Sequence, residues 1–187
     1  AAIGFIEIIN NSLTASKLYN EEQLDKAIYM LNPLSMDMNV LRMELVNSAL
    51  QTVAYNVNRK TTNVKFFEFG KVYTKENGKY VEKELLQLTF SGNRHPEHWS
   101  TSDKKATTDE LLAVIQNLAV RLNIPQKQIS KLITKHSIPK KQMKAHSLKQ
   151  DVATISLDWE ACLTAASLDI KLQEVPIFPV VRRDLSL

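Results

Sequence analysis

Residues 64 to 74 form an apolar run that predicts a strand inside a sheet. Along an extended chain Phe66 points to one side, whereas Phe67 and Phe69 point to the other, because successive side chains alternate. Apolar residues on both sides are typical of a strand that is covered on both faces, so we expect it at the centre of the sheet. Glu68 lies within the run, and burying a carboxylate is costly unless it is paired. We therefore predict a partner for Glu68.

Shorter patterns along the chain predict the remaining elements. We expect further strands at residues 4–9, 27–31, 85–91, 152–157 and 170–175. We expect helices at residues 14–19, 41–57, 107–122 and 158–166. The third of these helices begins with a capping box formed by Thr107 and Glu110. Residues 129–136 fit either a strand or a helix, and residues 137–150 show little pattern.

The order of these elements indicates the fold class. Strands and helices mix without a regular strand–helix–strand alternation, so we expect an α/β (α+β) fold with an antiparallel sheet flanked by helices. Asn77 and Gly78 have the composition of a hairpin turn between two of the strands. Residues 32–35, which begin with Asn32 and Pro33, are a second turn signal.

Length and composition narrow the class of protein. The chain has 187 residues, of which 44% are hydrophobic and 24% charged, which suits one sizeable domain. No apolar run approaches the roughly 20 residues of a membrane helix, so we expect no membrane partner. The single Cys162 excludes an internal disulfide and fits a reducing, cytoplasmic compartment. Both ends have strand-like patterns and the start has no signal peptide, so we expect a piece of a longer polypeptide.

Positive charge is concentrated in one part of the chain. Residues 111 to 150 contain no Asp or Glu but eight Lys or Arg residues. A surface of one sign attracts phosphate, although a solvated surface is the more frequent explanation of such a pattern. The candidates for contact with RNA are Lys127, Lys131, Lys135, Lys140, Lys141 and Lys144.

No catalytic or metal-binding set stands out among the residues. His95 and His98 are the only histidine pair with metal-like spacing, and no third ligand is near them. The chain has only four glycines, and they cannot form a glycine-rich phosphate loop. Arg42 and Glu44 suggest an exposed helical pair or a capping contact. We expect no catalytic residue, metal or cofactor site in this chain.

Five short blocks, in order, resemble the family of bacterial phenylalanyl-tRNA synthetase beta subunits. They are Gly-Phe-Ile-Glu-Ile-Ile at 4–9, Asn-Pro-Leu-Ser at 32–35, Leu-Arg at 41–42 with Asn-Val-Asn-Arg at 56–59, Phe-Glu-Phe-Gly-Lys-Val-Tyr at 67–73, and Phe-Pro-Val-Val-Arg-Arg-Asp-Leu at 178–185. Each block alone is weak. Their shared order and spacing are specific, and they span nearly the whole chain.

This resemblance implies a class II aminoacyl-tRNA synthetase-like core at residues 1–176 and the start of a ferredoxin-like anticodon-binding domain at residues 177–187. The beta subunit's copy of that core is described as catalytic-like but inactive. In the related alpha subunit, an arginine that grips the ATP phosphate closes a Gly-Arg-Val-Tyr-Arg block. The similar block here, residues 70–74, ends in Thr74, which has no charge. The family's glycine-rich third motif has no counterpart, and residues 137–149 are shorter than the family's usual segment.

The resemblance also implies a role in assembly. Two alpha and two beta subunits form the enzyme, in which the alpha subunit uses ATP and Mg²⁺ to attach phenylalanine to tRNA(Phe). The interface or structural candidates are Gly4, Phe5, Glu7, Asn32, Pro33, Arg42, Asn56, Arg59, Glu68 and Gly70. Among them, Arg42 and Arg59 are the expected partners of Glu68. Two alternatives stay open: a stand-alone RNA- or tRNA-binding module, and an independent ATP-using ligase.

Overall fold

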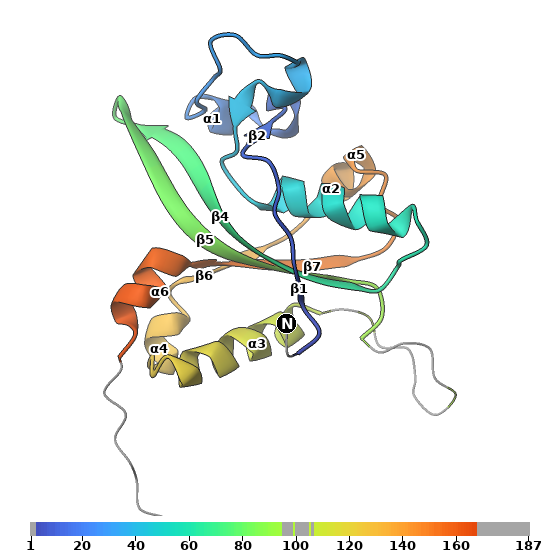
Figure 1. Ribbon diagram of the computed structural model, residues 1–187, viewed down its shortest axis with the longest axis vertical. Coiled ribbons are helices and arrows are strands. Elements are labelled where there is room, and N and C mark those ends of the chain that lie inside the picture. The colour runs from blue at the N-terminus through green and yellow to red at the C-terminus, as the bar shows by residue number, and fades with distance from the viewer. Residues whose placement is uncertain (1–2, 95–98, 100–104, 106, 168–187) are drawn as a thin grey trace, which may run out of the picture.

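The chain folds into three layers, with a sheet between two layers of helices (Figure 1). The computed structural model describes residues 3–94, 99, 105 and 107–167. Helices α2 (Val46–Val57) and α5 (Lys140–Ala145) cover one face of the sheet. Helices α3 (Thr108–Arg121) and α4 (Gln126–Ile129) cover the other, and α6 (Trp159–Ala165) follows the last strand. This arrangement confirms the expected fold class.

The sheet is mostly antiparallel. Within the described residues it has five strands in the order β1-β4-β5-β7-β6, namely β1 (Ile6–Glu7), β4 (Val64–Glu76), β5 (Lys79–Ser91), β7 (Val152–Asp158) and β6 (Ile133–His136). Among the described strands of this sheet, only β1 and β4 pair in parallel. The β4–β5 hairpin turns at Asn77 and Gly78, both with positive φ, which confirms the predicted turn.

Strand β4 is not the central strand, contrary to our expectation. It pairs with β1 only at Phe66 and Phe67, and β5 lies at the centre. Its face toward α2 is buried from Val64 to Val72, but on the opposite face Phe69 is 41% exposed. The reason is the position of α3, whose apolar residues pack mainly over β5 and β7.

Each face of the sheet has its own core. The core toward α3 contains helix residues such as Leu111 and Ile115 packed on Leu86, Leu88, Phe90, Ile155 and Leu157. The core toward α2 contains Val46, Leu50 and Val53 packed on Val64 and Phe66. Helix α3 begins at the predicted capping box of Thr107 and Glu110.

Residues 12–41 form a projection, the arm, at one end of the sheet (Figure 1). The arm consists of short elements, namely β2 (Leu13–Thr14), the 3-10 helices η1 (Ser16–Leu18) and η2 (Met36–Met38), α1 (Glu21–Leu24) and β3 (Val40–Leu41). Tyr19, Ala27 and Val40 form its small core. The pairing of β2 with β3 closes the arm at its base.

Several predicted elements in and around the arm are wrong. The helix at 14–19 is only the three-residue η1, and the strand at 27–31 is reduced to one bridge between Tyr29 and Val40. The helix at 41–57 begins at Val46, since Val40 and Leu41 belong to β3. Helix α5 was missed because residues 137–150 have little periodicity. The strand at 170–175, the histidine pair at 95 and 98, and residues 177–187 lie outside the described residues.

Candidate functional site

A buried ion pair lies at the base of the arm. Arg42 Nη1 is 2.7 Å from Glu68 Oε1, and the two side chains are only 5% and 1% exposed. Asn10 completes the carboxylate shell: its backbone N–H donates to Oε1 at 3.2 Å and its Nδ2 donates to Oε2 at 2.7 Å. Arg42 Nε also donates to the carbonyl of Lys71 at 2.9 Å. The prediction that Glu68 needs a partner is confirmed for Arg42.

Gly70 makes room for this pair. A Cβ at this position would lie 2.5 Å from Arg42 Nη2 and 2.9 Å from Leu45 Cδ2. Real Cβ atoms do not approach other atoms so closely, so any larger residue would displace the guanidinium. A buried charge that loses its partner costs about 3–5 kcal/mol, so Arg42, Glu68 and Gly70 form one interdependent unit.

The same residues fasten the arm to the sheet. The Arg42 N–H donates to the carbonyl of Ser12 at 2.8 Å, and the Arg42 carbonyl accepts from the N–H of Tyr73 at 2.9 Å. Asn10 Oδ1 accepts from Thr52 Oγ1 at 2.9 Å, which links the chain entering the arm to α2. The network therefore joins the two ends of the arm, strand β4 and helix α2 at one point.

A row of buried polar side chains crosses the face of the sheet toward α2. Ser156 donates to Gln87 Oε1 and is 2.8 Å from His136 Nε2, while Gln87 Nε2 donates to Thr154. Thr154 Oγ1 also lies 3.1 Å from the hydroxyl of Thr89. Because Ser156 donates to Gln87, His136 Nε2 carries the proton in this arrangement. Burial lowers the pKa of His136, which favours the neutral ring.

No buried side-chain nitrogen or oxygen in the described part of the chain lacks a hydrogen-bond partner. The polar groups on this face therefore satisfy one another. A nucleophile, base or phosphate ligand needs a group that is available to a substrate. The row contains the residue types of a catalytic site. Its polar groups, however, form hydrogen bonds with one another and none is available to a substrate.

The outer surface of the arm has the opposite character. Leu31 and Leu34 are 97% and 99% exposed. We call this region the apolar arm surface, and it consists of Tyr29, Met30, Leu31, Leu34, Met36 and Met38. Single exposed apolar residues are common on proteins, but several within ten positions are typical of a surface that a partner covers.

The remaining interface candidates lie at several places. Gly4 has a φ of 82° at a bend before β1, Phe5 is buried against α3, and Glu7 is exposed on β1. Asn32 and Pro33 lie in the exposed turn of the apolar arm surface.

Two candidates lie far from the ion pair, at the end of α2. Asn56 Nδ2 donates to the carbonyl of Thr52 at 2.8 Å. The expectation that Arg59 pairs with Glu68 is wrong, since its guanidinium lies 3.4 Å from the centre of the Tyr55 ring. The exposed pair of Arg42 and Glu44 is also wrong, because Arg42 turns inward to Glu68.

Asn10 and Thr52 are functional members of the network that the sequence did not reveal. Asn10 is 58 positions from Glu68 along the chain, and no local pattern reports such a contact. An asparagine directly after an apolar strand was the available signal. It indicates a polar residue at the end of an element, but not its partner.

The six candidate lysines for RNA are all exposed. Lys127 lies on α4, Lys131 lies just before β6, and Lys135 lies on β6. The other three lie on α5. They follow the β6 edge of the sheet from one helical layer to the other. Within the described residues, none of the six forms an ion pair.

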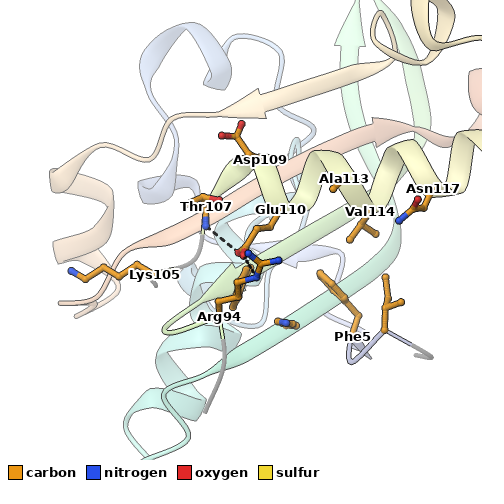
Figure 2. A pocket seen from close by; sticks show the side chains of 12 residues that line it. Phe5, Arg94, Lys105, Thr107, Asp109, Glu110, Ala113, Val114 and Asn117 are labelled. Atoms are coloured by element: carbon orange, nitrogen blue, oxygen red, sulfur yellow. Dashed lines mark hydrogen bonds and ion pairs between the residues drawn. The ribbon is translucent and has the colours of Figure 1, made fainter. Parts of the chain in front are cut away.

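The other side of the sheet contains an open cleft that is lined in part by Ile3 and Phe5. Figure 2 shows Phe5 and Val114 on its apolar wall and the ion pair of Arg94 and Glu110, 2.8 Å apart, at its polar end. The volume of the cleft is about 500 Å³.

Across the described ranges, no three His, Cys, Asp or Glu residues gather where they could hold a metal ion. Likewise, no described helix has the length and apolarity that a membrane span requires.

Comparison with known proteins gives a consistent result. Residues 1–159 match the family model described as the phenylalanyl tRNA synthetase beta chain CLM domain. The chain is 31% identical to the phenylalanine–tRNA ligase beta subunit of Bacteroides thetaiotaomicron, over 98% of this chain and 27% of that protein. It is 27% identical to the beta subunit of Thermotoga maritima, over 98% of this chain and 26% of that protein. The chain thus spans about a quarter of these relatives' length.

The alignment and the fold comparison add two further points. The match to the Bacteroides relative extends over 218 residues, so that relative has residues within this span that the 187-residue chain lacks. Among solved structures, pyrrolysyl-tRNA synthetase from Desulfitobacterium hafniense superposes with a TM-score of 0.61 at 12% identity, over 86% of this chain and 63% of that one. At this identity the likeness concerns the fold alone.

Proposed function

Because the chain belongs to the family of phenylalanyl-tRNA synthetase beta chains, we propose that it is a non-catalytic module that supports assembly with the alpha subunit of phenylalanine–tRNA ligase. In that enzyme, two alpha and two beta subunits attach phenylalanine to tRNA(Phe) in the cytoplasm. ATP and Mg²⁺ belong to the whole enzyme in this proposal, and this chain binds neither.

The apolar arm surface is the observation that carries the proposal. An interface core is enriched in aromatic residues and methionine, and this surface presents Tyr29 and three methionines together with Leu31 and Leu34. The ion pair of Arg42 and Glu68 holds the base of the arm rigid, so less entropy is lost when a partner docks. The neighbouring strand β1 has an unpaired edge within the described residues, which offers a second contact beside the arm.

Two features support the absence of catalysis. Thr74 stands where the resemblance places a phosphate-binding arginine, and a threonine cannot make a bidentate contact with phosphate. Gln87 and Ser156 are buried, and they form an internally bonded row with the half-buried His136. A substrate would have to break these bonds before it could use any of these groups.

The test is a binding titration between this chain and the purified alpha subunit of the same organism. The variant Leu31→Ser/Leu34→Ser removes the two most exposed leucines, and Tyr80→Ser on the β4–β5 hairpin is the matched control, since Tyr80 is also exposed. We expect the arm variant to raise the Kd at least about tenfold, with the control close to the wild type. Equal affinities for the arm variant and the wild type would contradict the proposal.

The exposed lysines along the β6 edge favour one second candidate, a module that binds RNA. Six cations without an ion pair among the described residues would release counterions on contact with a phosphate backbone. A titration with tRNA at two salt concentrations tests this candidate. The variant Lys135→Gln/Lys144→Gln should then weaken binding and reduce the salt dependence. Unchanged affinity and salt slope would exclude this surface.

A further inference from the structure

A polar cleft separates the arm from the helices beneath it. It lies between η1 with α1, the beginning of α2, and α5, and its volume is about 370 Å³. In Figure 1, the arm stands above α2 and α5 at this place. The side chains that matter are Tyr19, Glu44, Asn47, Lys141, Gln142 and His146.

The floor of the cleft consists of side chains that are held by hydrogen bonds to one another. Asn47 is 1% exposed, and its Nδ2 donates to Glu44 Oε1 at 2.8 Å. Its Oδ1 accepts from Gln142 Nε2 at 2.9 Å and lies 3.3 Å from His146 Nε2, so this histidine nitrogen is the donor. One buried amide thus fixes the Glu44 carboxylate and joins α2 to α5.

The Glu44 carboxylate has no ion-pair partner in the part of the chain that the structure describes. Within the described residues, no Lys or Arg forms an ion pair with it, whereas Glu68 is paired with Arg42. Lys17, at the rim of the cleft, is paired with Asp37 instead. Burial raises the pKa of Glu44, which shows that its charge is poorly solvated. A carboxylate in this situation gains from a cation that enters the cleft.

We propose that this cleft binds a ligand that carries an alkylammonium group, with the Glu44 carboxylate as the anchor. An ammonium group has three donors and fits a carboxylate in a polar cleft. Lys141 at the rim has no ion pair among the described residues and attracts an anionic group on the same ligand. The ammonium comes either from a free zwitterion or from a lysine side chain of a docked protein. The proposal does not depend on the function proposed above.

The test uses three probes that share one five-carbon chain, and binding is followed by the amide NMR signals of Asn47 and Gln142. Norleucine carries the ammonium and a carboxylate, pentylamine carries the ammonium alone, and hexanoate carries the carboxylate alone. We expect saturable shifts with norleucine and pentylamine below roughly 10 mM and none with hexanoate. Tighter binding of norleucine than of pentylamine indicates a free zwitterion, and equal binding indicates the end of a lysine side chain. Absence of saturable shifts with both amines overturns the proposal.

The variant Glu44→Gln removes the charge and keeps an oxygen that can accept from Asn47 Nδ2. It should weaken pentylamine binding at least about tenfold, since a charged partner is lost. Glu160→Gln, an exposed change on α6, is the matched control and should bind as the wild type does. Equal pentylamine affinity for Glu44→Gln and the wild type overturns the proposal.

A measurement on the wild type removes any dependence on the variant's folding. The titratable and charged groups that face Glu44 are Tyr19 and Lys17 from the arm and Lys141 and His146 from α5. Burial raises the pKa of Tyr19 to about 12 and lowers that of His146, so both are neutral near pH 7. Saturating pentylamine should lower the pKa of Glu44, followed by its carboxyl ¹³C signal. An unchanged pKa overturns the proposal.

Discussion

The inside of the sheet and the outside of the arm reverse the usual distribution of residues. The face of the sheet toward α2 buries Glu68, Gln87 and Thr154, which are polar or charged. The arm exposes Leu31 and Leu34, which are apolar. The buried polar groups are hydrogen-bonded to one another, whereas nothing in the described chain covers the exposed apolar groups. The contrast separates a part of the molecule that stabilises itself from a part that needs a partner.

The two regions are connected through one ion pair. Arg42 directly follows the arm, and Glu68 belongs to β4. A change in this pair should therefore affect both stability and the presentation of the arm, whereas a change on the arm's surface should affect binding alone.

Glu68→Ala should reduce the free energy of unfolding by about 3–5 kcal/mol, because it leaves Arg42 buried without its counter-charge. Urea unfolding measures this loss. Glu76→Ala is the matched control, since Glu76 is exposed at the end of the same strand and its loss should change little. If Glu68→Ala leaves both stability and binding to the alpha subunit unchanged, the connection between the two regions is refuted.

Gly70→Ala should cost about 1–3 kcal/mol, because the new Cβ would displace the Arg42 guanidinium. Gly78→Ala at the hairpin turn is an informative comparison, since no atom lies within 4 Å of a Cβ there and only the positive φ opposes the change. Thermal unfolding measures both variants. A smaller loss for Gly70→Ala than for Gly78→Ala would show that the space beside Arg42 is not tightly filled.

The sequence predicted the elements with a strong periodic or turn signal. The β4–β5 hairpin, helix α3 with its capping box and helix α6 all formed as expected. The arm was poorly predicted because its short elements depend on pairing between β2 and β3 and on the small core around Tyr19. Such contacts join positions that are distant along the chain, and no local pattern reports them.

The sequence predicted only part of the candidate site, again because contacts between distant positions leave no local pattern. The cost of a buried carboxylate correctly indicated a partner for Glu68, and Arg42 was one of the two arginines named. Arg59 was the other and was wrong, because the family resemblance pointed to two arginines and the sequence does not give their distances from Glu68. Asn10 was missed although it bonds both oxygens of Glu68.

The smallest expected effect is the pH dependence of stability that arises from two histidines. Burial lowers the pKa of His136 and His146, so below about pH 6.5 the unfolded chain takes up protons more readily than the folded chain. Stability should therefore fall as the pH falls from about 6.5 toward the lowered values. The raised pKa of Glu44 acts in the opposite sense, because the folded chain then takes up a proton first.

A comparison of variants isolates the histidines from this opposing effect. The variant His136→Gln/His146→Gln should lose about 1 kcal/mol less than the wild type between pH 7.5 and pH 5.5 in urea unfolding. Leu31→Ser on the apolar arm surface removes no titratable group, so its pH profile should follow that of the wild type. Parallel pH profiles for the histidine variant and the wild type would show that neither histidine is held neutral by burial.

Hydrogen–deuterium exchange, with and without the purified alpha subunit and with and without ATP, distinguishes an assembly surface on the arm from a nucleotide site on the sheet. We expect the alpha subunit to slow exchange in residues 28–41 and in β1, and ATP with Mg²⁺ alone to change no segment of this chain. Slower exchange in β4 and β5 on addition of ATP, with no change in the arm on addition of the alpha subunit, would contradict the proposed role in assembly.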